Sequence, residues 1–140
     1  MNDNIFIDTN IFVYAHVLGE EEKREKVHKL FNEALAGVNV VVSTQVLNEF
    51  YSAMSKYKCT HDDILLFMAD IIKKANVASV SLSTVEKCLS LKKTYGYSYW
   101  DSLILSSALE NECGAVYSED MQHNKTIDGK LTIINPFLQA

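Results

Sequence analysis

Short apolar runs alternate with longer helical patterns along this chain, and that alternation limits its fold more than any other feature. The runs with the composition of strands lie at residues 4–8, 38–42, 78–82, 115–117 and 131–134. Helical spacing or capping motifs mark the segments at 10–16, 20–36, 43–57 and 98–113, and those beginning at Thr60 and Ser83. Such alternation implies right-handed crossovers and parallel strands. We therefore predict a single α/β domain over residues 1–140, with three α/β/α layers and a central, mostly parallel sheet of five strands.

Composition and charge exclude several classes of protein. A hydrophobic fraction of 48% and a charged fraction of 22% are typical of a soluble globular chain. No apolar run approaches the ~18–20 residues that a membrane-spanning helix needs, so we expect a cytoplasmic protein. The net charge of −5 argues against gripping nucleic acid by bulk electrostatics. It fits either a local cluster of carboxylates or a surface for a basic partner.

Four acidic residues stand where a parallel sheet gathers its ligands, which is outside the carboxyl ends of its strands. These are Asp8 and Asp120, which follow strands, Asp101, which opens a helix, and Glu49, which lies on the helix leaving the second strand. Each has an ordinary explanation when taken alone. Asp8, Thr9 or Asn10 could cap the next helix. Asp101 could belong to a capping box. Glu49 could be a solvated residue on its helix, and Asp120 could belong to an acidic turn.

The combination of these acids points to chemistry, because a cluster of carboxylates repels itself unless a cation is present. Hard divalent cations prefer oxygen ligands, and Mg²⁺ commonly keeps several waters around one or two carboxylates. Such a metal can activate a water, polarise a phosphate oxygen and stabilise a leaving oxygen. We therefore predict a Mg²⁺ or Mn²⁺ site at Asp8, Glu49, Asp101 and Asp120. If Asp8 belongs to the metal site, we expect the cap of the following helix to be Thr9 or Asn10 rather than Asp8.

Four segments, in order along the chain, resemble the motifs of PIN domains. They are Ile5–Phe12 with its Asp-Thr-Asn, Ser43–Phe50 with its glutamate, Tyr99–Ile104 with its aspartate, and Tyr117–Met121. The resemblance continues to Ile133–Phe137 and implies a divalent-metal endoribonuclease that hydrolyses RNA. It points to Asp8, Glu49, Asp101 and Asp120 as the acidic site, with Thr9, Asn10 and Ser118 as supporting polar groups. Small stand-alone bacterial members are mostly VapC-type toxins, which implies a small antitoxin partner. Together with the apolar, aromatic helices, the resemblance also implies a homodimer.

The chain departs from many RNA-cleaving relatives in having a single arginine. That departure keeps an alternative open, namely a catalytically weak or inactive PIN-like module that binds a protein or RNA partner. A phosphatase-like domain is disfavoured, because Asp8-x-Asn10 lacks the second aspartate of such sites. The candidate phosphate contacts are Lys23, Arg24, Lys26, Lys56, Lys58, Lys92 and Lys93. An aromatic cluster, Tyr95, Tyr97, Tyr99 and Trp100, could stack bases or pack against the core or an oligomer interface.

Overall fold

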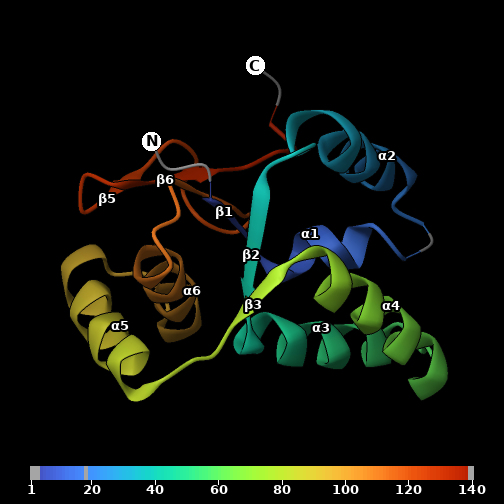
Figure 1. Cartoon of the computed structure of the whole chain (residues 1–140), viewed down its shortest axis with the longest axis horizontal. Coiled ribbons are helices and arrows are strands. Elements are labelled where there is room, and N and C mark those ends of the chain that lie inside the picture. The colour runs from blue at the N-terminus through green and yellow to red at the C-terminus, as the bar shows by residue number, and fades with distance from the viewer. Residues whose placement is uncertain (1–3, 18, 139–140) are drawn as a thin grey trace.

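One twisted sheet with helices on both faces forms the body of the protein (Figure 1). The computed structural model describes residues 4–17 and 19–138. Its strands are β1 (Asn4–Ile7), β2 (Asn39–Ser43), β3 (Asn76–Ala78), β4 (Ala115–Tyr117), β5 (Thr126–Ile127) and β6 (Leu131–Ile134). Its helices are α1 (Thr9–Tyr14), α2 (Glu21–Lys29), α3 (Thr44–Lys56), α4 (His61–Lys74), α5 (Leu82–Tyr95) and α6 (Tyr99–Glu110). A π-helical turn, η1 (Leu30–Ala34), extends α2.

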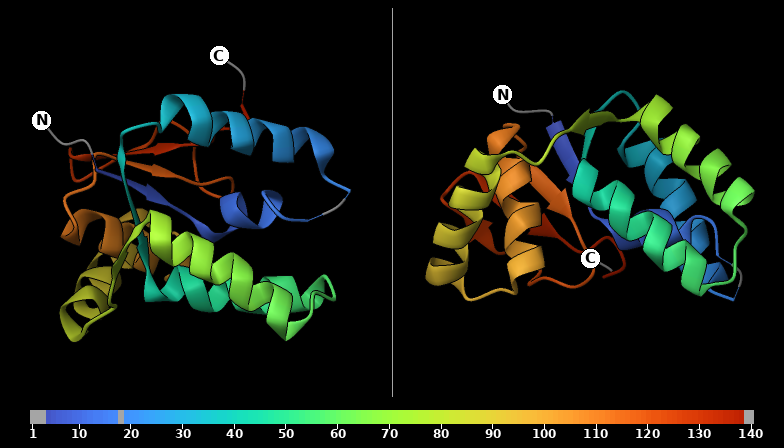
Figure 2. Two further views of the ribbon diagram at one scale, coloured as in Figure 1. Left: turned by 45° about the vertical axis from the view of Figure 1, so that its right-hand side comes forward. Right: turned by 90° about the horizontal axis from the view of Figure 1, so that it is seen from below.

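The strand order is β3-β2-β1-β4-β6-β5, and every pairing except that of β5 with β6 is parallel. Helix α2 lies on one side of the sheet, and helices α3 to α6 lie on the other (Figure 2). The predicted three-layer fold with a mostly parallel sheet is therefore confirmed. Among the helices of the described residues, none combines the length and apolar character that spanning a bilayer requires.

The predicted number of strands was wrong, because the sheet has six strands in the described part of the chain. The additional strand, β5, has two residues, which is too short to show the alternation by which strands are recognised. It pairs with β6 through the turn at Asp128 and Gly129, both of which have positive φ, as in a tight hairpin.

The third strand lies earlier than predicted, at Asn76–Ala78 rather than 78–82, and α5 already begins at Leu82. The apolar side chain of Leu82 suggested a strand but is 74% exposed on the helix. The capping box predicted at Ser83 lies two residues earlier, where the backbone N–H of Ser81 donates to Thr84 Oγ1 at 3.1 Å. The predicted caps Thr60 and Ser98 are confirmed.

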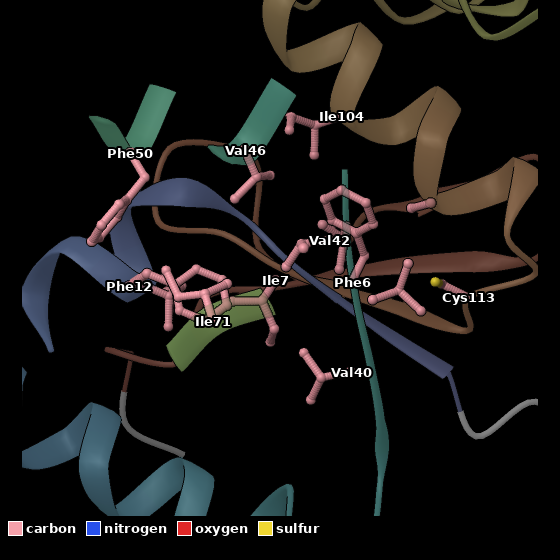
Figure 3. Packing of buried hydrophobic residues seen from close by; sticks show 14 of the residues in the cluster. Phe6, Ile7, Phe12, Val40, Val42, Val46, Phe50, Ile71, Ile104 and Cys113 are labelled. Atoms are coloured by element: carbon pink, nitrogen blue, oxygen red, sulfur yellow. The ribbon is translucent and has the colours of Figure 1, made fainter. Parts of the chain in front are cut away.

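Strand β1 lies in the centre of the sheet and is apolar on both faces. Phe6 and Ile7 are fully buried, as expected for a parallel strand that is covered by helices on both sides. Val42 of β2 and Val46 of α3 pack around them (Figure 3). Ile7 is in register with Tyr117 of β4, so the carboxyl ends of these neighbouring strands open at the same edge. This packing determines where the residue after β1 lies.

Candidate functional site

Asp8 follows β1 directly and is almost completely buried, with 7% of its surface exposed. Its backbone N–H donates to the carbonyl of Tyr117 at 3.0 Å. Its Oδ1 accepts a hydrogen bond from the Thr9 N–H at 2.7 Å, and its Oδ2 accepts one from Ser118 Oγ at 2.9 Å. The carboxylate is therefore held by the residue after β4 and by the first residue of α1.

The interpretation of Thr9 or Asn10 as the helix cap was wrong, because Asp8 itself is the N-cap of α1. The chain passes from β1 into α1 with Asp8 as the only residue between them, so the cap position falls on Asp8. Burial raises the pKa of the Asp8 carboxyl to about 6, and the charges of Glu49 and Asp101 add to this, although the hydrogen bonds from Thr9 and Ser118 work against it. A carboxylate in this position would gain from a nearby cation.

Glu49 on α3 is held by donors from two other positions. Thr9 Oγ1 donates to its Oε1 at 2.9 Å, and Gln45 Nε2 donates to its Oε2 at 3.3 Å. The buried Gln45 amide also donates to the carbonyl of Trp100 at 3.1 Å, which ties α3 to the first turn of α6. Gln45 was not predicted from the sequence. Its spacing of one helical turn from Glu49 was the available signal.

Asp120 and Asp101 complete the acidic group. Asn10 Nδ2 donates to Asp120 Oδ2 at 2.9 Å, and the N–H of Asp120 points to Ser118 Oγ at 3.4 Å. The backbone N–H of Asp101 donates to Ser98 Oγ at 3.1 Å, which confirms the predicted cap. Partial burial raises the pKa of the Asp101 carboxyl against the effect of its hydrogen bond with Ser98, and the charges of Asp120 and Glu49 raise it further.

These four acids line one open cavity of about 630 Å³ at the carboxyl edge of the sheet. Thr9 and Asn10 also line it, whereas Ser118 lies behind Asp8. Of the seven basic residues singled out from the sequence, only Lys56 lines this cavity. The structure therefore brings together all the acids that the sequence analysis selected, with one lysine beside them.

The loop that carries Asp120 is anchored by its neighbour, Glu119. Tyr14 Oη donates to Glu119 Oε1 at 2.6 Å, and Lys23 Nζ donates to Oε2 at 2.5 Å. Partial burial works to raise the pKa of the Glu119 carboxyl, but the bonds from Lys23 and Tyr14 outweigh it and lower the pKa. This anchor was not predicted, because Glu119 is 96 residues from Lys23 and 105 from Tyr14 in the sequence.

The oxygen donors suit a hard divalent cation, although they do not form a closed cage. Within residues 4–17 and 19–138, no three His, Cys, Asp or Glu side chains are placed so that they could hold a metal ion among them. Mg²⁺ commonly keeps several waters and takes one or two carboxylates directly. The buried Asp8 carboxylate and its acidic neighbours in an open cavity fit that manner of binding.

Comparisons with known proteins agree with the fold. The family model of the PIN domain matches residues 5–127, and no curated protein matches the chain. The structure of the Mycobacterium tuberculosis toxin VapC20, which cleaves the sarcin-ricin loop, has a TM-score of 0.69 at 18% identity, covering 83% of this chain and 89% of VapC20. A Klebsiella pneumoniae toxin–antitoxin complex has a TM-score of 0.68 at 19% identity, covering 95% of this chain and 98% of the matched chain. VapBC2 from Rickettsia felis, bound to a promoter DNA fragment, has a TM-score of 0.66 at 18% identity, covering 94% of this chain and 99% of the matched chain. At these identities the three structures show a shared fold.

The raised pKa of Asp8 predicts a specific pH dependence of stability in a metal-free buffer. The Asp8 carboxyl keeps its proton up to about pH 6 in the folded protein and loses it near pH 3.8 in the unfolded chain. The contribution of this protonated carboxyl to stability is therefore complete below pH 3.8 and is lost as pH rises through 6. Compared with Asp8→Asn, the natural chain should therefore lose about 2 kcal/mol of unfolding free energy between pH 4 and pH 7. Urea unfolding of both chains across this range, with chelator present, measures the difference. A constant difference would contradict the environment assigned to Asp8.

Proposed function

The chain belongs to the PIN-domain family, and on that premise we propose that it is a divalent-metal-dependent endoribonuclease that hydrolyses RNA phosphodiester bonds. One observation carries the proposal. Asp8, Glu49, Asp101 and Asp120 come from four different parts of the chain and line the same cavity. A group of carboxylates that repel one another, with raised pKa values at Asp8 and Asp101, is best explained by a cation that they share.

In the proposed site, one or two of these four carboxylates would bind Mg²⁺ or Mn²⁺ directly, and the others would bind it through its waters. The bound metal would activate a water and stabilise the charge that develops on the phosphate. Thr9 and Gln45 orient the Glu49 carboxylate, and Asn10 orients that of Asp120. Ser118 fixes Asp8 from behind, so that its carboxylate cannot turn away from the cavity. Lys56 offers a positive charge to a phosphate of the RNA at the side of the cavity.

Cleavage of RNA should depend on both the metal and the acids. We expect single-stranded or structured RNA to be cut in Mg²⁺ or Mn²⁺ and left intact in chelator. Asp8→Asn and Asp101→Asn should each lower the rate by about 100-fold or more, as removal of a group that stabilises charge in the transition state does. A gel assay with labelled RNA measures the rates, and circular dichroism checks that each variant is folded. Asp70→Asn serves as the matched control, because Asp70 is paired with Lys74 on α4 and lines no part of this cavity.

Full cleavage by both site variants would refute the assignment of these acids. The alternative, an inactive binding module, is distinguished by calorimetry with Mn²⁺. No heat of binding at millimolar Mn²⁺ together with no cleavage would favour the binding module. Binding of Mn²⁺ that is weakened in Asp8→Asn and kept in Asp70→Asn supports the proposed metal site.

The likeness to toxin–antitoxin proteins supports a more specific role, that of a cytoplasmic toxin neutralised by a small antitoxin. Helix α4 exposes three large apolar side chains, Leu65, Leu66 and Ile72, with 49%, 70% and 50% of their surfaces accessible. Exposed apolar side chains gathered on one helix are typical of surfaces that bind another protein.

The toxin role predicts an effect on bacterial growth. Expression of the chain alone should arrest growth, and co-expression with a short reading frame directly upstream of its gene should restore it. Expression of Asp101→Asn should leave growth unaffected at the same protein level. Normal growth with the unmodified chain would contradict the toxin role without touching the nuclease proposal.

A homodimer is also expected. Light scattering at micromolar concentration should give twice the mass of the chain. A monomer at that concentration would remove this expectation, and Leu66→Ser tests whether the exposed apolar side chains of α4 contribute to the dimer.

A further inference from the structure

Trp100 is the only tryptophan of the chain, and it is 60% exposed although it is a large aromatic residue. It lies in the first turn of α6, next to Asp101, with its ring edge-on to that of Tyr99 at 5.0 Å between centroids. The same side chain lines the acidic cavity and a second cavity of about 470 Å³. Trp100 therefore stands on the border between the two cavities.

The second cavity differs in chemistry from the first. Val80, Leu103 and Trp100 provide apolar surface, and Asn48 adds an exposed amide from α3. Within the described residues, the Asn48 side chain has no hydrogen-bond partner. The cavity thus offers a flat aromatic ring and apolar walls, with the exposed Asn48 amide able both to donate and to accept hydrogen bonds.

The two cavities adjoin, because Glu49, Ser52 and Trp100 line both. Helix α3 runs past both of them, with Asn48 at the second cavity and Lys56 at the first. These two residues are about 12 Å apart along the helix axis. A chain molecule held at the acids would therefore continue into the second cavity, with Lys56 beside its other end.

We propose that Trp100 and Asn48 form a binding subsite for the nucleobase that adjoins the scissile phosphate of a single-stranded RNA. This inference rests on the proposed ribonuclease function. Any base can stack on an exposed indole, and an amide can hydrogen-bond to the edge of an unpaired base. A phosphate is disfavoured there, because Glu49 lines the cavity and no basic residue does. A base is the part of RNA that matches this surface.

The fluorescence of Trp100 tests the subsite directly, since no other tryptophan contributes to the signal. We use the folded Asp8→Asn chain in saturating Mg²⁺, so that the remaining acids still hold the cation and RNA stays intact, and titrate it with a short oligoribonucleotide or an abasic chain of equal length. Binding of each is measured independently by the anisotropy of an end label. The oligoribonucleotide should quench Trp100, and the abasic chain should not. With four homo-oligomers, Asn48→Ala should reduce the differences in affinity between the bases.

Variants made in the Asp8→Asn chain quantify the contribution of the ring. Trp100→Ala should weaken oligoribonucleotide binding by about 10- to 100-fold, and Trp100→Phe should restore most of it. Leu89→Ala is the matched control, because Leu89 is 55% exposed on α5 and lines neither cavity. The affinity of this variant for the oligoribonucleotide should not change. If Trp100→Ala fails to fold, the fluorescence of the unsubstituted Trp100 still decides the question.

The possible failures are distinguishable. Oligoribonucleotide binding by anisotropy without any change in Trp100 emission would overturn the subsite and leave the ribonuclease proposal intact. No binding of RNA would overturn the subsite, and the gel assay of the natural chain would decide the ribonuclease function separately. In the absence of RNA, the emission of Trp100 could instead shift to the blue as protein concentration rises. That shift, together with no quenching by RNA, would show that a second copy covers Trp100, and it would overturn the subsite.

Discussion

The burial of one carboxylate, that of Asp8 at the end of the central strand, is the constraint on which the rest of the site depends. Phe6 and Ile7 have no exposed surface, so β1 delivers Asp8 into a region with little water. Its two oxygens are satisfied by the Thr9 N–H and the Ser118 hydroxyl, and burial still raises its pKa to about 6. A charge in such a position is costly unless it is paired. The site therefore has a reason to attract a cation before any catalysis is considered.

Neutral hydrogen-bond donors hold the other carboxylates close to Asp8 in spite of their mutual repulsion. Thr9 and Gln45 bind opposite oxygens of Glu49, and the Gln45 amide continues to the Trp100 carbonyl. A chain of hydrogen bonds thus runs from β4 through α1 and α3 to α6. None of these donors neutralises a charge, so the network positions the acids and leaves their charge available. The only ion pair beside the acids, among the described residues, joins Lys23 to Glu119 and fixes the loop rather than the cavity.

The acidic balance of the chain acquires a physical meaning in this arrangement. A net charge of −5 and a single lysine in the cavity lining give weak bulk attraction for RNA. In the proposed function, recognition would then rest on the shared cation and on contacts with unpaired bases. The exposed ring of Trp100, placed between the acidic cavity and an apolar one, is suited to the second of these tasks.

Local patterns in the sequence were sufficient for the layers of the fold, and their combination selected four acids that line one cavity. β1 is a continuous apolar run that ends in an acid, and Asp101 follows a capping serine, so neighbouring residues alone mark both positions. The two-residue β5 was not predicted, because it is defined by its pairing with β6. The early start of α5 was not predicted either, because Leu82 is apolar but exposed on the helix. The roles of Gln45 and Glu119, and of Asp8 as the helix cap, were decided only by the tertiary structure. Gln45 and Glu119 each bond to groups 55 to 105 residues away, and Asp8 is bonded to Ser118 across 110 residues. Hydrogen bonds over such separations form only when packing of the core has fixed where each strand ends.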